Sequence, residues 1–174
     1  MDRYGQMDVW ELARRRYQLY MEMSELDEEL NRRRTQDRHL MKKSEIQWEP
    51  RSVIGMKIPH KRAPLIEPNL GFNCHNIEAF IAEYPPGSEE GAYHMHGEAI
   101  KYYLSGRGIE IIGDKRYEVE AGDAIFIPAY TWHGSQNPGT EPLRFLALIQ
   151  LTGTPLLKPV PFTLRKDLRE DNSR

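Results

Sequence analysis

The chain has 174 residues, of which 39% are hydrophobic and 29% charged, enough for one ordinary domain with an appendage. Its formal net charge of −2 gives no electrostatic basis for nucleic-acid binding, and no long apolar segment predicts a membrane span. The single cysteine, Cys74, excludes an intramolecular disulfide and a Cys-based zinc cluster. Because residues 1–16 are charged throughout and show no signal-peptide pattern, we expect a cytoplasmic protein.

Residues 1–50 are predicted to form an N-terminal helical arm. Residues 8–43 contain no proline or glycine, and a break is expected at 31–34, which would give two helices. Their apolar residues recur on one face, at Leu12, Leu19, Met23, Leu26 and Leu30. The arginine runs 14–16 and 32–34 are balanced by acidic residues, which indicates a solvated face. Because an apolar stripe needs a surface to cover it, we expect a homodimer or higher homo-oligomer with the arm at or beside the interface.

Residues 51–154 are predicted to form an all-β antiparallel barrel. A proline-rich connector with an edge strand at 53–57 comes first. Short strand-like runs then follow at spacings near ten, with glycine and proline between them. These runs are 77–82, 99–104, 107–112, 115–119, 124–127 and 143–151, and Gly113-Asp114 is a two-residue hairpin signal. Residues 155–174 are expected to form a tail on the surface or on a partner.

A metal site is predicted from three histidines of the barrel region. His94 and His96 are two residues apart, so on an extended strand they share one face and can turn both ring nitrogens to one ion at ~2.0–2.1 Å. His133 follows a glycine turn and a short apolar run. Such a site leaves open positions for exchangeable ligands. The other histidines, His39, His60 and His75, are expected to be exposed or hydrogen-bonded.

These residues resemble the two motifs of the cupin superfamily, which consists of small antiparallel jelly-roll barrels. The resemblance covers 77–150 and implies a jelly-roll barrel carrying the N-terminal helical arm. It also implies a divalent metal, for which Fe(II) is favoured and Zn, Ni, Cu or Mn remain alternatives. The first motif is matched by Gly87, His94, His96 and Gly106, and the second by Gly122, Pro128, His133 and Asn137. Tyr130 stands where the second motif usually has a glycine.

The glutamate that is normally the fourth ligand of the family is missing at its usual place. It should fall near Ala99 or Ile100, which cannot bind a metal. Glu98 comes one or two positions early, and a shift of one residue on a strand turns a side chain to the other face. Whether Glu98 is a fourth ligand stays open. A three-histidine site without a carboxylate resembles gentisate-type ring-cleaving dioxygenases, as do the phrase 131–133 and a basic residue, Lys101, in the following strand.

Candidate catalytic residues are Lys101 and Tyr103. Alternation places both on one face of the run 99–104. If that face points inward, Lys101 could pair with a substrate carboxylate or stabilise developing negative charge, and a tyrosine could act in acid–base chemistry. The alternative is that Lys101 faces solvent. Candidate substrate-binding residues are Tyr102, Tyr130, Trp132, Arg144 and Gln150, the last if its face of the strand points inward.

The predicted function is that of a cupin metalloenzyme. The resemblance implies a non-haem Fe(II) dioxygenase that uses O₂ to cleave a C–C bond in a small hydroxylated aromatic or other chelating acid. A redox-neutral lyase, isomerase or decarboxylase, in which the ion acts as a Lewis acid, is the first alternative. A non-enzymatic small-molecule-binding cupin is the second. Oxygen consumption and the identity of the metal separate these possibilities.

Overall fold

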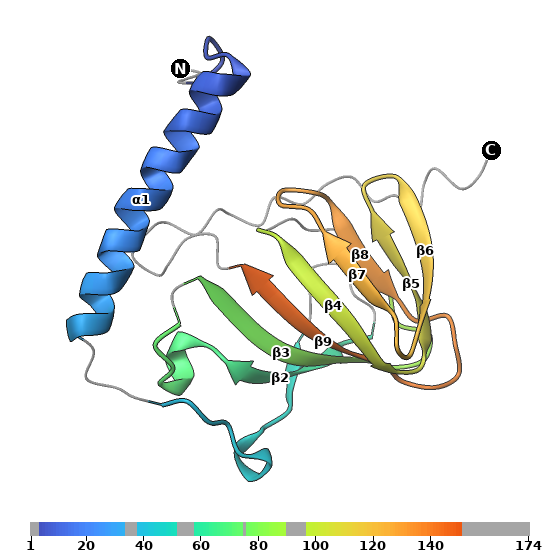
Figure 1. Ribbon diagram of the computed structural model, residues 1–174. Coiled ribbons are helices and arrows are strands. Elements are labelled where there is room, and N and C mark those ends of the chain that lie inside the picture. The colour runs from blue at the N-terminus through green and yellow to red at the C-terminus, as the bar shows by residue number, and fades with distance from the viewer. Residues whose placement is uncertain (1–3, 34–37, 52–57, 75, 90–96, 151–174) are drawn as a thin grey trace. The chain divides into compact units, whose positions relative to one another are not determined.

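The computed structural model describes residues 4–33, 38–51, 58–74, 76–89 and 97–150. The chain forms two compact units, Met1–Arg38 and His39–Arg174. The first contains the helix and the second contains the strands (Figure 1). No helix among the described residues is long and apolar enough to cross a membrane.

The first unit is organised by helix α1 (Val9–Arg33). Its start is a capping box: Asp8 Oδ1 accepts the backbone N–H groups of Trp10 and Glu11 at 2.7 and 2.8 Å, and Glu11 Oε2 accepts that of Asp8 at 2.9 Å. Near its end, Glu29 accepts hydrogen bonds from Arg32. The helix ends within the segment where a break is predicted.

A second α-helix is predicted after the break, up to residue 43. The described residues 38–43 form no α-helix, so this prediction is wrong for them. Lys42 has an extended backbone with φ −76° and ψ 145°, and it is followed only by the short 3-10 helix η1 (Lys43–Glu45). The Glu45 carboxylate accepts the Lys42 backbone N–H at 2.9 Å, which stabilises this single turn. This part of the chain therefore forms a single capped 3-10 turn instead of the predicted α-helix.

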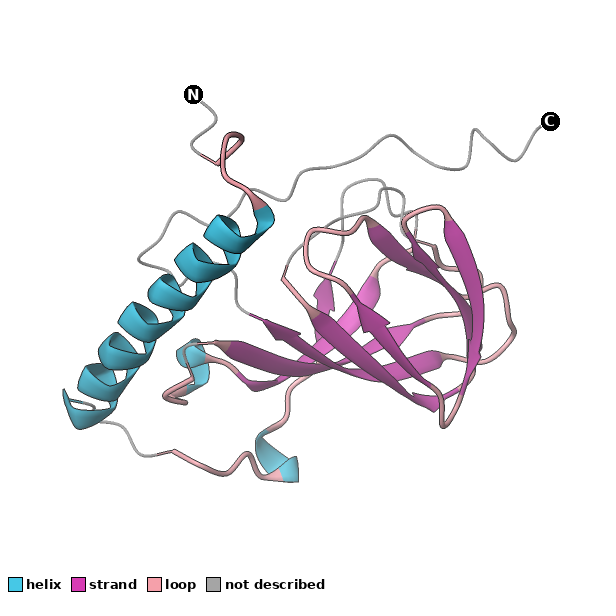
Figure 2. Cartoon of the chain, turned by 45° about the horizontal axis from the view of Figure 1, so that its top comes forward, coloured by secondary structure: helices cyan, strands magenta, loops and turns pink. Residues whose placement is uncertain are grey.

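The second unit consists of two antiparallel sheets that curve around a common interior (Figures 1 and 2). The larger sheet has the order β1 (Glu49–Arg51), β2 (His60–Ile66), β3 (Ile77–Tyr84), β9 (Leu143–Gln150), β4 (Ala99–Ser105) and β7 (Ala124–Ile127). The smaller has the order β6 (Lys115–Glu120), β5 (Arg107–Ile112) and β8 (His133–Gln136). A further 3-10 helix, η2 (Pro68–Leu70), precedes β3. The sheets form a jelly-roll barrel, which confirms the predicted fold class. The predicted edge strand at 53–57 and the tail at 155–174 lie outside the described residues.

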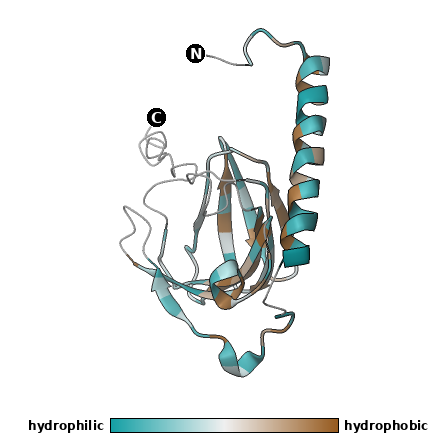
Figure 3. Ribbon diagram, turned by 90° about the vertical axis from the view of Figure 1, so that its left-hand side faces the viewer, coloured by the Kyte–Doolittle hydropathy of each residue, from teal (hydrophilic) through white to brown (hydrophobic). Residues whose placement is uncertain are grey.

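Alternation along β4 and β9 decides which side chains enter the barrel. Tyr103 of β4 lies opposite Phe145 of β9 in the register, and both are buried, with their rings in an edge-to-face contact at 5.6 Å. In both strands the residues that alternate with these buried ones point outward. On β4 these are Ile100, Tyr102 and Leu104, which are each almost half exposed. Figure 3 shows that apolar and polar residues are mixed along the strands of the barrel. One packed cluster of the core consists of Ala82, Tyr84, Tyr103, Val119, Leu143, Phe145 and Ala147.

Asn137, the last residue of the second motif, ties the loops at one end of the barrel. It is fully buried, and its amide donates to the backbone oxygens of Tyr84 at 2.8 Å and Glu141 at 2.9 Å. Its Oδ1 accepts the Gly139 N–H at 3.0 Å. The side chain therefore satisfies backbone groups of two separate segments, the end of β3 and the loop between β8 and β9, which is a structural role for the motif asparagine.

Candidate metal and ligand site

His133, at the start of β8, is the predicted metal ligand that the structure describes. Its side chain is fully buried, and Nδ1 lies 2.8 Å from the backbone oxygen of Thr131. Because a carbonyl oxygen can only accept, Nδ1 carries the proton, and in the neutral ring Nε2 then carries the lone pair. A metal-binding histidine is usually oriented by just such a bond from its other nitrogen. The geometry of His133 therefore fits a metal ligand.

The other two predicted ligands, His94 and His96, fall in residues 90–96 and lie outside the described residues. The residue before that segment, Glu89, forms an isolated antiparallel bridge with Gln136, on the same strand as His133. Among the residues that the structure describes, no cluster of three His, Cys, Asp or Glu side chains could hold a metal. The three-histidine site thus remains a prediction, with one of its members placed.

Glu98 is placed on the outer face of the sheet. Its side chain is exposed, and it shares the parity of the outward-facing Ile100. Its backbone pairs with Gln150, whose N–H donates to the Glu98 oxygen at 2.8 Å. Because Ala99 and Lys101 occupy the buried face of β4, Glu98 lies on the opposite side of the sheet from them. This placement favours a ligand set without Glu98.

A buried network of four polar side chains, the Lys101 cluster, fills part of the barrel interior. It consists of Lys101, Tyr103, Glu110 and Ser135. Lys101 Nζ lies 2.6 Å from Glu110 Oε1 and donates to Ser135 Oγ at 2.9 Å. Tyr103 and Ser135 donate their hydroxyl hydrogens to Glu110 Oε2 at 3.0 and 2.9 Å. Lys101 is 5% exposed, and the other three are fully buried.

The cluster lies close to His133 along the strand. Ser135 is two residues after His133, so both side chains point to the same face of β8, about 6–7 Å apart along the strand. In the register, Ser135 lies opposite Glu110 of β5, and His133 lies opposite Ile112. Lys101 Nζ also lies 4.7 Å from the centre of the Phe145 ring, a cation–π contact. A buried ion pair has a large desolvation cost, so its place beside a candidate metal ligand indicates a functional interior.

The structure places the two residues predicted to be catalytic together and joins them to two polar side chains, Glu110 and Ser135, that the sequence analysis missed. Lys101 and Tyr103 share the inner face of β4, and the solvent-facing alternative for Lys101 is wrong. Glu110 and Ser135 were missed because each looks ordinary alone. The available signals were a single acid within the apolar run 109–112 and a hydroxyl two residues after a predicted ligand.

Three of the predicted substrate-binding residues lie on the outer face of the sheet. Tyr102 alternates with Lys101 and is 46% exposed. On β9, Leu143, Phe145 and Ala147 point inward, so the inward orientation that Gln150 would need is not met. Arg144 is likewise exposed and forms an ion pair with Glu83 at 2.5 Å. The structure therefore separates Tyr102, Arg144 and Gln150 from the Lys101 cluster.

The remaining two, Tyr130 and Trp132, lie in the turn between β7 and β8. Tyr130 is 57% exposed and has φ 58°, a left-handed conformation that explains why the motif usually has glycine there. Trp132 is partly buried, and its backbone oxygen accepts the Gly113 N–H at 2.7 Å. Both residues flank His133 in the chain.

The described histidines outside the motifs and the single cysteine are not candidates for the metal site. His60 is 4% exposed and stacks on Tyr84 with ring centres 4.6 Å apart, so it is a packed core histidine. His39 is exposed, and His75 lies outside the described residues. Burial raises the pKa of the Cys74 thiol, which keeps it protonated and disfavours metal binding.

Comparisons with known proteins agree with this fold. Residues 80–149 match the family model of the cupin domain. An uncharacterized protein of Methanocaldococcus jannaschii is 36% identical over 85 residues, 47% of this chain, and the oxalate-binding protein of Thermotoga maritima is 38% identical over 80 residues, 44% of this chain. Each match spans 66% of the relative's length, just under two thirds. The crystal structure of a predicted oxalate decarboxylase from Thermotoga maritima is 31% identical, with a TM-score of 0.56, and the match covers 64% of this chain and 98% of that one.

The antiparallel barrel, its motif residues and these matches define a small jelly-roll protein. The chain belongs to the cupin superfamily.

Proposed function

We propose that this cupin is a metalloenzyme in which a divalent cation, held by His94, His96 and His133, binds a small chelating carboxylic acid. The observation that carries this proposal is the arrangement of His133 beside a buried lysine. His133 has its Nδ1 proton engaged by Thr131, and Lys101 is held on the inner face of β4. A cation with an ammonium group near it favours an anionic ligand.

A metal fits the residues that are present. Three neutral imidazoles are suitable ligands for Fe(II), Zn, Ni or Mn, and they leave the ion its full positive charge. When bound, the ion would polarise substrate oxygen atoms as a Lewis acid, and Fe(II) would in addition supply redox chemistry toward O₂. We favour Fe(II) because a ligand set of histidines alone resembles that of the ring-cleaving dioxygenases. Glu98, the described carboxylate next to His96 in the chain, is on the outer face of the sheet and so does not add to this set.

Lys101 is proposed to bind the carboxylate of the ligand. An ammonium group has three donors. Two are used by Glu110 and Ser135, so within the described part of the chain one remains for a ligand. Glu110 and Ser135 fix the position of Nζ, which lowers the entropy that a ligand's hydrogen bond must offset. Tyr103 holds a proton at its hydroxyl, 3.0 Å from Glu110, and so is the candidate proton carrier of the same network.

Two reactions are compatible with this site. We propose oxygen-dependent C–C cleavage of a hydroxylated aromatic acid, for which the histidine-only ligand set is the supporting feature. The second candidate is a redox-neutral reaction, such as decarboxylation of a small dicarboxylate. It is favoured by the 38% identical oxalate-binding protein and by the predicted oxalate decarboxylase. Binding without turnover would identify a small-molecule-binding cupin instead.

Metal content tests the ligand assignment. Protein purified without added metal should contain about one ion per chain, and His94→Ala, His96→Ala and His133→Ala should each lose most of it. His60→Ala is the matched control because His60 is also a buried histidine but stacks on Tyr84. Equal metal content in all four variants would refute the three-histidine site.

Ligand binding and turnover then separate the possible functions. Titration calorimetry with oxalate and with a dihydroxybenzoate should show binding that requires the metal. The double variant Lys101→Met/Glu110→Gln removes the ammonium without leaving a buried carboxylate unpaired, and it should raise the Kd about 10–100-fold with the metal retained. Lys61→Met, an exposed lysine, is the control. Oxygen uptake with the dihydroxybenzoate supports the dioxygenase, whereas CO₂ release from oxalate without oxygen uptake supports the second candidate. An unchanged Kd in the double variant would place Lys101 outside the binding site.

A further inference from the structure

Helix α1 exposes an apolar seam that repeats every seven residues. None of the described residues of α1 is buried. Positions spaced alternately by three and four residues form the seam: Val9, Leu12, Arg16, Leu19, Met23, Leu26, Leu30 and Arg33. Six of these eight are apolar and, by exposure, range from Leu19 at 38% to Val9 at 71%. Alternating spacings of three and four are those of the a and d positions of a coiled coil.

We propose that α1 pairs with α1 of a second copy of this chain as an antiparallel two-stranded coiled coil. In proteins, a helix gains most of its stability from the packing of its apolar face rather than from its intrinsic helix propensity. The 25 residues of α1 supply more than three heptads, which is long enough for a specific pairing.

The register of full overlap matches the seams of the two copies. It sets Val9 of one copy opposite Arg33 of the other, and the inner layers are then mostly apolar. Leu12 lies opposite Leu30, and Leu19 lies opposite Met23. Because the arrangement is two-fold symmetric, each of these layers occurs twice.

The charges on α1 favour the antiparallel orientation over the parallel one. A parallel pair would set Arg16 against Arg16 in the seam, and Glu22 against Asp27 on both flanks. The antiparallel pair sets Arg16 against Leu26, where a long arginine side chain can lay its methylene groups on the seam and reach water. It also brings Arg15 near Glu29 on both sides, with one unfavourable contact between the two Glu22 residues. Opposed helix dipoles add to this preference.

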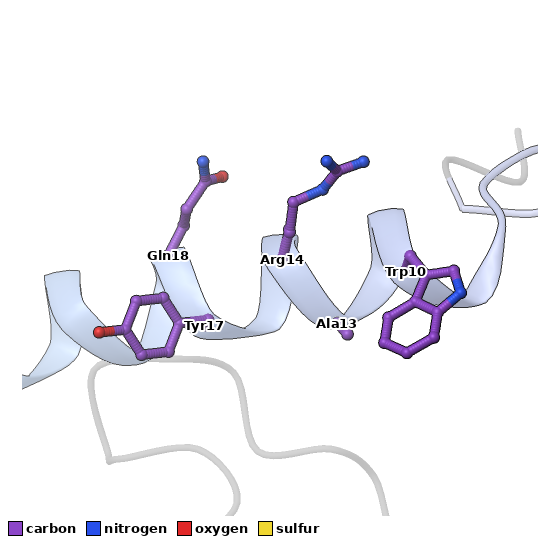
Figure 4. Close-up of a pocket in the computed structure, with 5 residues that line it drawn as sticks. All are labelled: Trp10, Ala13, Arg14, Tyr17 and Gln18. Atoms are coloured by element: carbon purple, nitrogen blue, oxygen red, sulfur yellow. The ribbon is translucent and has the colours of Figure 1, made fainter.

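A second apolar strip on α1 provides the competing hypothesis. Trp10, Ala13 and Tyr17 lie along one side of the helix and line a shallow pocket with Arg14 and Gln18 (Figure 4). Met21 continues this strip by one turn and lies off the heptad seam. If the strip rather than the seam were the contact surface, Met21 would be buried in the assembly and Met23 would not.

Met23 and Met21 therefore form a matched pair for the test. Both are exposed methionines, at 53% and 43%. By light scattering, the full chain should have the mass of two copies. Met23→Glu buries a charge in the seam, so it should raise the dimer Kd more than about tenfold and lower the helical circular dichroism. Met21→Glu should leave the mass of a dimer. The proposal that the seam is the dimer contact would be refuted by any of three results: a monomeric wild type, a dimer that survives Met23→Glu, or a dimer lost in Met21→Glu.

A distance measurement tests the orientation. Spin labels on Trp10→Cys, in a Cys74→Ser background, lie near opposite ends of an antiparallel coil. Position 10 is then opposite position 32, so the labels should be about 33 Å apart along the axis. Labels that lie side by side would overturn the antiparallel arrangement while keeping a coiled coil. A further check is charge reversal: Arg15→Glu should weaken the dimer, and adding Glu29→Arg should restore it.

Discussion

The barrel and the helix break the usual distribution of side chains in opposite ways. The barrel buries charged groups: Lys101 and Glu110 are 5% and 0% exposed. Helix α1 exposes large apolar groups, with Trp10 at 76% and Leu26 at 63%. Buried charges and contiguous exposed apolar surfaces are both costly in a folded protein and are therefore informative.

The two departures indicate different kinds of interaction. In the barrel the charges are satisfied by one another, so the Lys101 cluster is preorganised and a ligand meets fixed groups. On the helix the apolar seam lies along one face of α1, and only packing against another surface can remove it from water. The first departure underlies the small-molecule site proposed for the barrel, and the second underlies the proposed pairing of α1 with a second copy.

The largest expected effect comes from breaking the Lys101 cluster. Glu110→Ala leaves a buried ammonium without its carboxylate and should lower the free energy of unfolding of the barrel by about 3–5 kcal/mol. Glu120→Ala removes the carboxylate of an exposed ion pair with Arg107 and should change it by less than about 1 kcal/mol. Urea unfolding followed by circular dichroism measures both. Equal midpoints for the two variants would mean that the cluster is not a stabilising unit.

A smaller effect is expected at the motif glycine Gly106, which lies against the backbone of Pro142 and Leu143 at the start of β9. It has φ 82°, and a Cβ there would lie 2.4 Å from the backbone oxygen of Pro142. Gly106→Ala should lower the free energy of unfolding, measured by urea unfolding, by about 2–4 kcal/mol. Both the left-handed backbone conformation and the overlap of the new Cβ with the Pro142 backbone oppose the substitution.

Gly113 is the matched control for this prediction. It has φ 63°, but a Cβ at this position meets nothing within 4 Å. Gly113→Ala should therefore cost only about 1 kcal/mol, from the left-handed conformation alone. If the two substitutions cost the same, the close approach of Gly106 to Pro142 is not what the motif glycine preserves.

The fold could be predicted from the sequence because its signals are local. Alternating strands and the Gly113-Asp114 hairpin each depend on neighbouring residues, and the structure contains both. The second helix predicted after the break at 31–34 was wrong for residues 38–43, where the chain is extended at Lys42 and forms only the 3-10 helix η1.

The interior site could be predicted only in part. The inward face of β4 was one of two alternatives, and the Tyr103–Phe145 contact, a pairing of residues 42 positions apart, decides between them. The partnership of Lys101 with Glu110 and Ser135 joins three strands of both sheets, which no spacing along the chain reveals. On β9 the same long-range register turned Arg144 and Gln150 outward.

The smallest expected effect is at Tyr130, where the barrel keeps a non-glycine residue in a left-handed conformation. Tyr130→Gly relieves a cost of about 1–2 kcal/mol but adds the entropy that glycine loses on folding, so a net gain of about 0.5–1 kcal/mol in unfolding free energy is expected. If the ring contacts the ligand as proposed, the same substitution should weaken dihydroxybenzoate binding, so stability and affinity move in opposite directions. Tyr130→Phe keeps the ring and the strain, and it should change neither quantity. A gain in stability with unchanged affinity would show that Tyr130 only occupies the turn, and Trp132 would then be the remaining candidate substrate-binding residue beside His133.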